Sequence, residues 1–167
     1  MAAEPSLKSP AEGSTAPGRV RRLALPGARG AVSRARMFAA DALLDWQWLP
    51  SGGTLRREAA EDVLLLVSEL VTNACLHTSG PTELTLSCTP ERMRIEVGDR
   101  SGALPGPQPG RHPGRPGGHG LLLVDRLASR WGVERRQDGK TVWVEVAAPV
   151  DWPPQQAAPI GRVRQHH

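Results

Sequence analysis

The sequence predicts an α+β fold, a two-layer α/β sandwich in which about three helices cover one face of a mixed, mostly antiparallel sheet. Two observations carry this prediction. Segments that alternate polar and apolar residues come in adjacent pairs, at 82–99 and at 131–149, as antiparallel strands joined by tight turns do. Apolar residues at helical spacing precede and separate these pairs, and such helices bury their apolar side against a sheet. With 167 residues the chain is long enough to bury the core of one domain.

The first part of this domain is predicted to hold one strand and two helices. Residues 21–27 alternate enough to form a short strand that ends at a Pro-Gly pair. Residues 31–48 carry apolar side chains at the spacing of an amphipathic helix. Thr54 suits the N-cap of a second, longer helix over 55–77, which the Ser-Gly-Pro sequence at 79–81 ends.

The second part is predicted to hold four strands and one more helix. The strands alternate polar and apolar residues and cover 82–89, 92–99, 131–136 and 140–149. Tight turns at Pro90-Glu91 and at Asp138-Gly139 join them in pairs. Between the pairs, a helix begins at Gly120. It follows a loop over 100–119 that is rich in proline and glycine, and a loop this long inside a compact domain is typical of a functional segment.

Composition sets the limits of the domain and of its partners. Residues 1–18 are rich in Ala, Pro, Ser and Gly and are predicted to be a disordered tail, 19–150 to be the domain, and 151–167 to be a flexible C-terminal tail. The net charge of +4 lies in loops and tails, and no helix face or aromatic strand is basic. We therefore expect no direct nucleic-acid partner.

The cellular setting follows from three absences in the sequence. No apolar run reaches the roughly 20 residues that span a bilayer, and the N-terminus lacks the apolar core of a secretory signal. Cys75 and Cys88 fall in a helix pattern and a strand pattern, so a disulfide framework is not expected. These features predict a reduced, cytoplasmic protein with no membrane partner.

The first candidate for chemistry is the predicted helix over 55–77. Glu69, Asn73 and His77 are spaced four residues apart and share one stripe, rotated away from the apolar positions. Such a stripe is typical of a solvated helix face. It also suits a metal–phosphate site, because an amide oxygen is a neutral ligand for Mg²⁺ and a carboxylate one turn earlier can accept a proton.

Two further places could hold parts of a ligand. Asp99 follows a strand within VGDRSG (97–102) and could accept a hydrogen bond from a ring amine, although a strand-end Asp often bonds only to its own turn. Gly117, Gly118 and Gly120 precede an apolar helix whose free N–H groups and dipole attract anions, although such glycines are often only a cap. Together, a metal-capable Asn, an amine-capable Asp and a phosphate-capable turn are the parts needed to hold ATP, with 100–119 as a lid.

Four segments in this order resemble the N, G1, G2 and final-strand boxes of the ATP-binding anti-sigma regulatory factors. These are serine/threonine kinases of the GHKL superfamily, and the Ala-, Arg-, Gly- and Pro-rich composition resembles their actinobacterial versions. The segments are SELVTNACLHT (68–78), VGDRSGALP (97–105), GGHGLLLVDRLASRWGV (117–133) and GKTVWVEV (139–146). The resemblance spans about residues 20–148 and implies a Bergerat-type ATP-binding fold.

The resemblance also implies roles for the residues that match the boxes. Asn73 would coordinate the Mg²⁺ that bridges the phosphates, and Glu69 would orient or deprotonate the attacking serine hydroxyl. His77 would lie beside the nucleotide. Asp99 would receive the adenine amino group, with Gly102 in the same box.

The two remaining boxes imply contacts to other parts of the nucleotide. Gly118 and Gly120 would line the phosphates, and Thr141 would support the adenine pocket through water. ATP and Mg²⁺ are thus the implied cofactors.

Three functions follow from these residues and the resemblance. The leading one is an anti-sigma factor that binds a sigma factor and uses Mg-ATP to phosphorylate a serine of a STAS-type anti-anti-sigma protein, with a homodimer left open. The alternative is a nucleotide-gated sigma-factor or partner-binding module without kinase activity, which would keep Glu69 and Asn73 as well. The catalytic fragment of a histidine kinase is disfavoured, because no phosphoacceptor helix precedes the first predicted strand.

Overall fold

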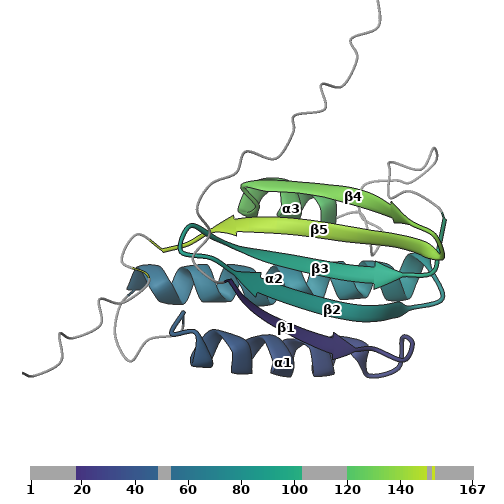
Figure 1. The fold of residues 1–167 in the computed structure, drawn as a ribbon, viewed down its shortest axis with the longest axis horizontal. Helices are drawn as coiled ribbons and strands as arrows, with labels where there is room; N and C mark the ends of the chain where they lie inside the picture. Colours follow the sequence, from purple (N-terminus) through teal and green to yellow (C-terminus); the bar gives the residue numbers. More distant parts are fainter. Residues whose placement is uncertain (1–17, 49–53, 103–119, 150–151, 153–167) are drawn as a thin grey trace, which may run out of the picture.

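The computed structural model of the chain describes residues 18–48, 54–102, 120–149 and 152. These residues form a sheet layer and a helix layer, which are visible in Figure 1. The elements in chain order are β1 (Arg19–Ala24), α1 (Ala31–Asp45), α2 (Thr54–His77), β2 (Pro81–Cys88), β3 (Arg92–Asp99), α3 (Gly120–Leu127), β4 (Arg130–Arg136) and β5 (Gly139–Ala147). Residues 1–17 and most of 151–167 from the predicted tails, and 103–119 of the predicted lid, lie outside the described residues.

The sheet has five strands in the order β1-β2-β3-β5-β4. Every neighbouring pair is antiparallel, so the described strands include none of the parallel pairs of a mixed sheet. The last strand, β5, lies between β3 and the edge strand β4. This order makes β5 the cross-strand partner of β3, and it confirms the α+β sandwich.

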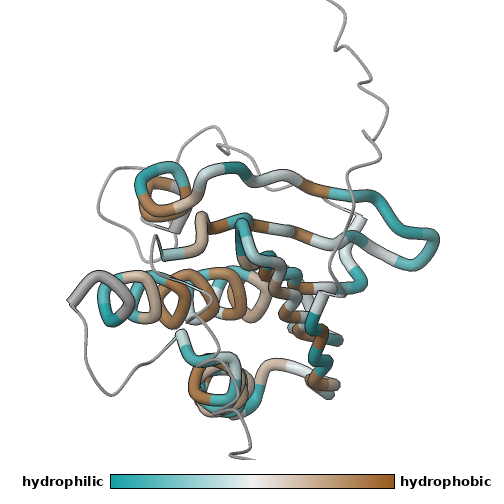
Figure 2. The backbone as a smooth tube through the Cα atoms, turned by 60° about the vertical axis from the view of Figure 1, so that its left-hand side comes forward, coloured by the Kyte–Doolittle hydropathy of each residue, from teal (hydrophilic) through white to brown (hydrophobic). Residues whose placement is uncertain are grey.

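The helices pack on one face of this sheet, as Figure 2 shows from the side. Helix α1 buries alanines at Ala31, Ala35, Ala39 and Ala42, one on each successive turn, and these small side chains let it approach the core closely. Helix α2 packs against α1, α3 and the sheet. None of the described helices is both long and apolar enough to cross a membrane.

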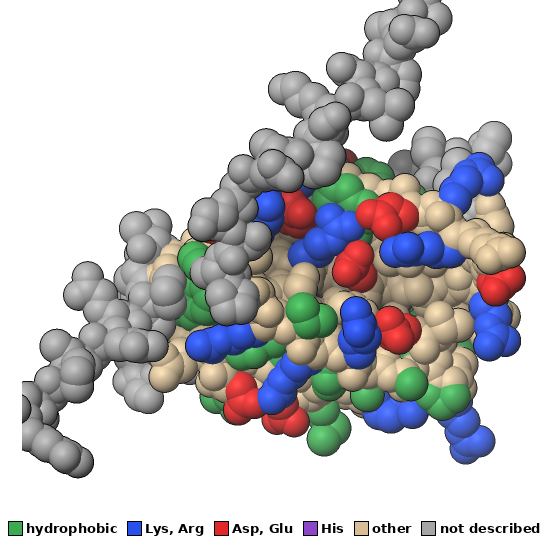
Figure 3. Space-filling view, in the orientation of Figure 1, with side chains coloured by type: hydrophobic (Ala, Val, Ile, Leu, Met, Phe, Trp, Pro, Cys, Tyr) green, Lys and Arg blue, Asp and Glu red, His purple; other side chains and the backbone are tan. Residues whose placement is uncertain are grey.

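The opposite face of the sheet carries paired charges, with apolar side chains scattered among them (Figure 3). At its centre Arg94 forms ion pairs with Glu134 at 2.9 Å, Glu96 at 3.2 Å and Glu145 at 3.3 Å, and its guanidinium lies 4.2 Å from the centroid of the Trp143 ring. This alternation, apolar toward the helices and charged away from them, is the one expected of an antiparallel sheet covered on one side.

Trp152, in the segment predicted to be a flexible tail, is buried against the domain. Its ring lies 5.8 Å from that of Trp48, centroid to centroid, and its Nε1 donates a hydrogen bond of 2.7 Å to the carbonyl oxygen of Trp46. A single aromatic residue therefore extends the packed part of the chain past β5.

We expect Trp152→Ala to lower the free energy of unfolding by about 3 kcal/mol, because it removes a buried aromatic ring and its hydrogen bond. Urea denaturation followed by circular dichroism measures this loss. Trp131→Ala is the matched control, since Trp131 is partly exposed on β4 and its loss should cost clearly less. Equal effects of the two substitutions would show that Trp152 does not stabilise the domain.

Candidate functional site

Helix α2 has a buried side and a polar side within the same few turns. Leu66, Leu70 and Ala74 are buried against the core. Glu69 and Asn73, one turn apart, are half-buried, and His77, one turn further, is exposed. The spacing of four residues therefore brings these three predicted residues to one border of the helix.

Asn73 has an unusual environment on that border. Its Oδ1 atom is buried and accepts no hydrogen bond from the residues that the structure describes. A buried amide oxygen without a donor costs roughly 1–3 kcal/mol, so native structures rarely keep one without a reason. An oxygen in this state is ready to bind a cation.

The donor set around this atom fits Mg²⁺. No cluster of three or more His, Cys, Asp or Glu residues that could hold a metal occurs within the described parts of the chain. Mg²⁺ does not need one, because it is usually held by one or two protein oxygens together with water and substrate phosphates. The Asn73 amide oxygen suits that mode of binding.

Asp99 ends β3 on the face that the helices cover, in alternation with the buried Val97. Its Oδ1 atom accepts hydrogen bonds from the backbone N–H of Ser101 at 2.7 Å and from Nζ of Lys140 at 3.1 Å. Only 2% of the Asp99 side chain and 6% of the Lys140 side chain are exposed. The predicted amine acceptor is therefore half of a buried ion pair.

The structure does not bring Thr141 to the same face as Asp99. Thr141 is paired with Gly98, so its side chain lies on the charged face of the sheet, where the Thr141 hydroxyl accepts a hydrogen bond of 3.3 Å from Nε of Arg136. The final-strand residue that contacts Asp99 is Lys140, which the sequence analysis did not single out. Strict alternation along 139–147 was the signal that could have found it, because it turns residue 140 toward the helices.

Two of the predicted glycines, Gly102 and Gly120, lie within the described residues. Gly102 is exposed just after Asp99, and a Cβ placed there would meet nothing within 4 Å. Gly120 is the first residue of α3, which packs against α2 and β4. Gly118 lies outside the described residues. The roles of these glycines, of His77 and of Thr141 stay predictions.

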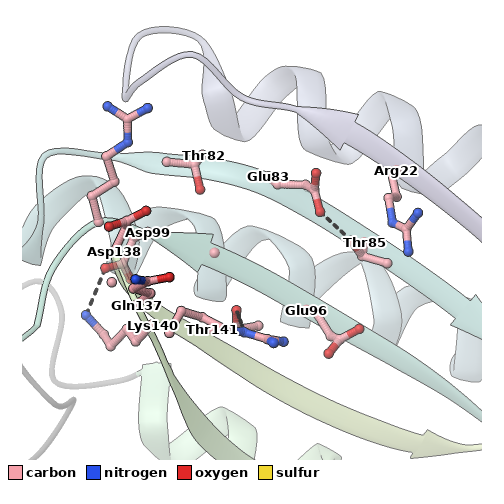
Figure 4. A pocket seen from close by; sticks show the side chains of 14 residues that line it. Arg22, Thr82, Glu83, Thr85, Glu96, Asp99, Gln137, Asp138, Lys140 and Thr141 are labelled. Atoms are coloured by element: carbon pink, nitrogen blue, oxygen red, sulfur yellow. Dashed lines mark hydrogen bonds and ion pairs between the residues drawn. The ribbon is translucent and has the colours of Figure 1, made fainter.

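A groove of about 550 Å³ lies beside Asp99, next to the β4–β5 turn. Figure 4 shows its lining, with Glu83 and Thr85 from β2, Glu96 from β3 and Thr141 from β5. Asp99 and Lys140 line it too, whereas Glu69, Asn73 and His77 do not. The groove is polar, and both acidic and basic side chains line it.

The two cysteines are poor candidates for nucleophiles. Both thiols are free. Burial raises the pKa of the Cys88 thiol to about 11, and burial also raises the pKa of the Cys75 thiol above its usual value. A raised pKa lowers the fraction of the reactive thiolate at neutral pH, so the chemistry of this site does not depend on cysteine.

We expect one fast and one slow thiol in labelling with a disulfide reagent at about pH 8. Cys75, which is half-buried, should react first, and Cys88, which is buried on β2, should react only after urea unfolds the domain. Labelling of Cys75→Ser and Cys88→Ser variants assigns the two phases. A rapid reaction at Cys88 in the folded protein would contradict its burial.

One comparison with known proteins gives a match. The family model described as "Histidine kinase-like ATPase domain" matches residues 26–146, a span that runs from the end of β1 to β5 and includes α2, Asp99 and Lys140. A search of curated proteins finds no match.

Proposed function

The chain belongs to the histidine kinase-like ATPase family, an ATP-binding family, and on that premise we propose that it is a cytoplasmic serine/threonine kinase and anti-sigma factor. It would bind a sigma factor and phosphorylate a serine of a small STAS-type antagonist, using ATP. The observation that carries the proposal is the pair on α2: a carboxylate at Glu69 and, one turn later, the unpartnered amide oxygen of Asn73.

Each member of this pair has a defined task in phosphoryl transfer. Asn73 Oδ1 would be a ligand of Mg²⁺, which neutralises phosphate charge when it is bound. Glu69 would accept the proton of the attacking serine hydroxyl. The hydroxyl oxygen would then bond to the γ-phosphorus of ATP, and the bond from that phosphorus to the β-phosphate oxygen would break and release ADP. Because this chemistry is mostly positioning and charge neutralisation, two side chains on one helix can supply much of it.

Asp99 would hold the other end of the nucleotide. It lies at the end of a strand on the helix-covered face, and α2 packs against that strand. A buried carboxylate oxygen accepts a hydrogen bond from an exocyclic amine and rejects a carbonyl oxygen at the same place. This supports adenine as the base.

The test is a phosphotransfer assay. The protein is incubated with ATP labelled at the γ-phosphate, Mg²⁺ and candidate STAS-type proteins, and label on the antagonist is measured beside ATP affinity from calorimetry. Transfer to serine supports the kinase. ATP binding without transfer to any candidate is the result expected of the alternative, a nucleotide-gated binding module, and absence of ATP binding would overturn both functions.

A further inference from the structure

We propose that Lys140 is a positioning residue that fixes the Asp99 carboxylate so that the site selects a 6-amino purine over a 6-oxo purine. The inference rests on the nucleotide site proposed above and adds to it a residue that determines base specificity. It is carried by the geometry of one buried ion pair, Lys140 with Asp99.

The pair is too enclosed to be an incidental surface contact. Each side chain is more than nine-tenths buried, and the distance from Nζ of Lys140 to Oδ1 of Asp99 is 3.1 Å. A lysine that loses its hydration in this way is stable only when its charge is paired. Separating Lys140 from Asp99 would leave an unpaired charge in the interior, and this free-energy cost keeps the two side chains together.

The two oxygens of the Asp99 carboxylate differ in their hydrogen bonds. Oδ1 accepts from both Lys140 and the backbone N–H of Ser101. Oδ2 receives no hydrogen bond from the residues that the structure describes, although each oxygen of a carboxylate can accept two. Two donors on Oδ1 fix the plane of the group and leave Oδ2 as the oxygen with open acceptor capacity.

The backbone makes this arrangement rigid. Lys140 lies directly opposite Asp99 in the pairing of β3 with β5. Next to it, Gly139 has a φ of 151°, and a Cβ at that position would lie 1.9 Å from the carbonyl oxygen of Asp99. The turn before β5 is thus packed against the end of β3, where only glycine fits, and this close packing favours the register that places Lys140 opposite Asp99.

The chemistry of selection follows from how the carboxylate is held. With Lys140 present, two donors on Oδ1 keep Oδ2 in one place, where it binds an amino group and repels a carbonyl oxygen. Without Lys140, one of the two donors is lost, so the carboxylate can turn about its Cβ–Cγ bond. A carboxylate that turns gains less from the amino group of adenine and discriminates less against the 6-oxo group of inosine.

The experiment compares the dissociation constants of ATP and of inosine triphosphate, both with Mg²⁺, by calorimetry on the full chain. The unaltered protein should bind ATP at least about 10-fold more tightly, the effect of one hydrogen bond to a charged acceptor. Lys140→Met should bring the ratio of the two constants to within about 3-fold of unity, because the acceptor oxygen is no longer held in one place. Lys140→Arg, which keeps the positive charge, should restore most of the preference.

The control is Arg135→Met. Arg135 is exposed and lies opposite Lys140 on β4, so this change removes a neighbouring positive charge without touching Asp99. It should leave the ratio unchanged. A merely structural role of Lys140 would weaken the binding of both nucleotides together, whereas a positioning role changes their ratio.

If Lys140→Met fails to fold, the double variant Asp99→Asn with Lys140→Met removes the unpaired carboxylate, and it should also lose the preference, since an amide both donates and accepts. An unchanged preference in either variant would overturn the inference while leaving the nucleotide site in place. Failure of the unaltered protein to bind either triphosphate would overturn the proposed function, and the inference with it.

Discussion

Replacing Asn73 by alanine will weaken Mg-ATP binding by at least about 100-fold, because even the partners that only orient a metal ligand contribute 10–100-fold to metal affinity. The fold will survive the change. Among the described residues the Oδ1 atom of Asn73 has no hydrogen-bond donor, so its removal breaks no such bond and relieves a buried, unsatisfied acceptor. We expect the free energy of unfolding to stay within about 1 kcal/mol of its original value.

Calorimetry with and without Mg²⁺ and urea denaturation measure the two quantities separately. Asn73→Asp is the matched control, since it keeps an oxygen ligand at the same place and should retain metal-dependent binding. If Asn73→Ala binds Mg-ATP with unchanged affinity, Asn73 is not a metal ligand. If the variant loses both binding and stability, the amide has a structural role that its lack of a partner does not reveal.

The contrast between affinity and stability at Asn73 is what a functional residue should show. A core position such as Leu66, buried on the same helix, is selected for packing, and truncating it would cost stability directly. If Asn73 is a metal ligand, it should lower stability in the absence of the metal and be compensated only on binding. Leu66 and Asn73 differ by less than a quarter turn around α2. Buried packing residues and the proposed metal ligand therefore lie next to each other on this helix.

Local pattern was enough to predict the elements of this fold. Helical spacing placed α2 to within a residue, and alternation placed β3 at 92–99, as observed. These signals are readable because each depends on neighbours along the chain and on one covered face. Burial of Asp99 at the end of β3 follows the same alternation.

The contacts of the candidate site depend on pairings between segments that are distant in the chain. Patterns among neighbouring residues do not predict such pairings. Lys140 meets Asp99 because β5 inserts between β3 and β4, and alternation within β5 cannot say which strand lies beside it. The unpartnered state of Asn73 Oδ1 likewise depends on how α2 packs on its neighbours. The sequence predicts a tail around Trp152 because one aromatic residue among prolines and glutamines gives no periodic signal.

Replacing Glu69 by glutamine will reduce phosphotransfer by about 10²–10⁴-fold, the usual contribution of a general base, while ATP affinity changes by less than about 3-fold. The glutamine amide matches the shape and polarity of the carboxylate but cannot take up the proton of the serine hydroxyl. Its effect should therefore fall on kcat with KM for ATP preserved, because the lost interaction belongs to the transition state. Single-turnover transfer of labelled phosphate to the antagonist protein measures it.

Glu61→Gln is the control for this change, because Glu61 is exposed two turns earlier on the same helix and its substitution removes the same charge. A loss of transfer in both variants would indicate that the acidic surface of α2 binds the protein substrate and that Glu69 is not the base. A full rate in Glu69→Gln would exclude the base role outright and leave positioning by Asn73 and Asp99 as the main source of catalysis. We expect only Glu69→Gln to lose phosphotransfer. That result requires two different groups one turn apart on α2, Asn73 for the metal and Glu69 for the proton.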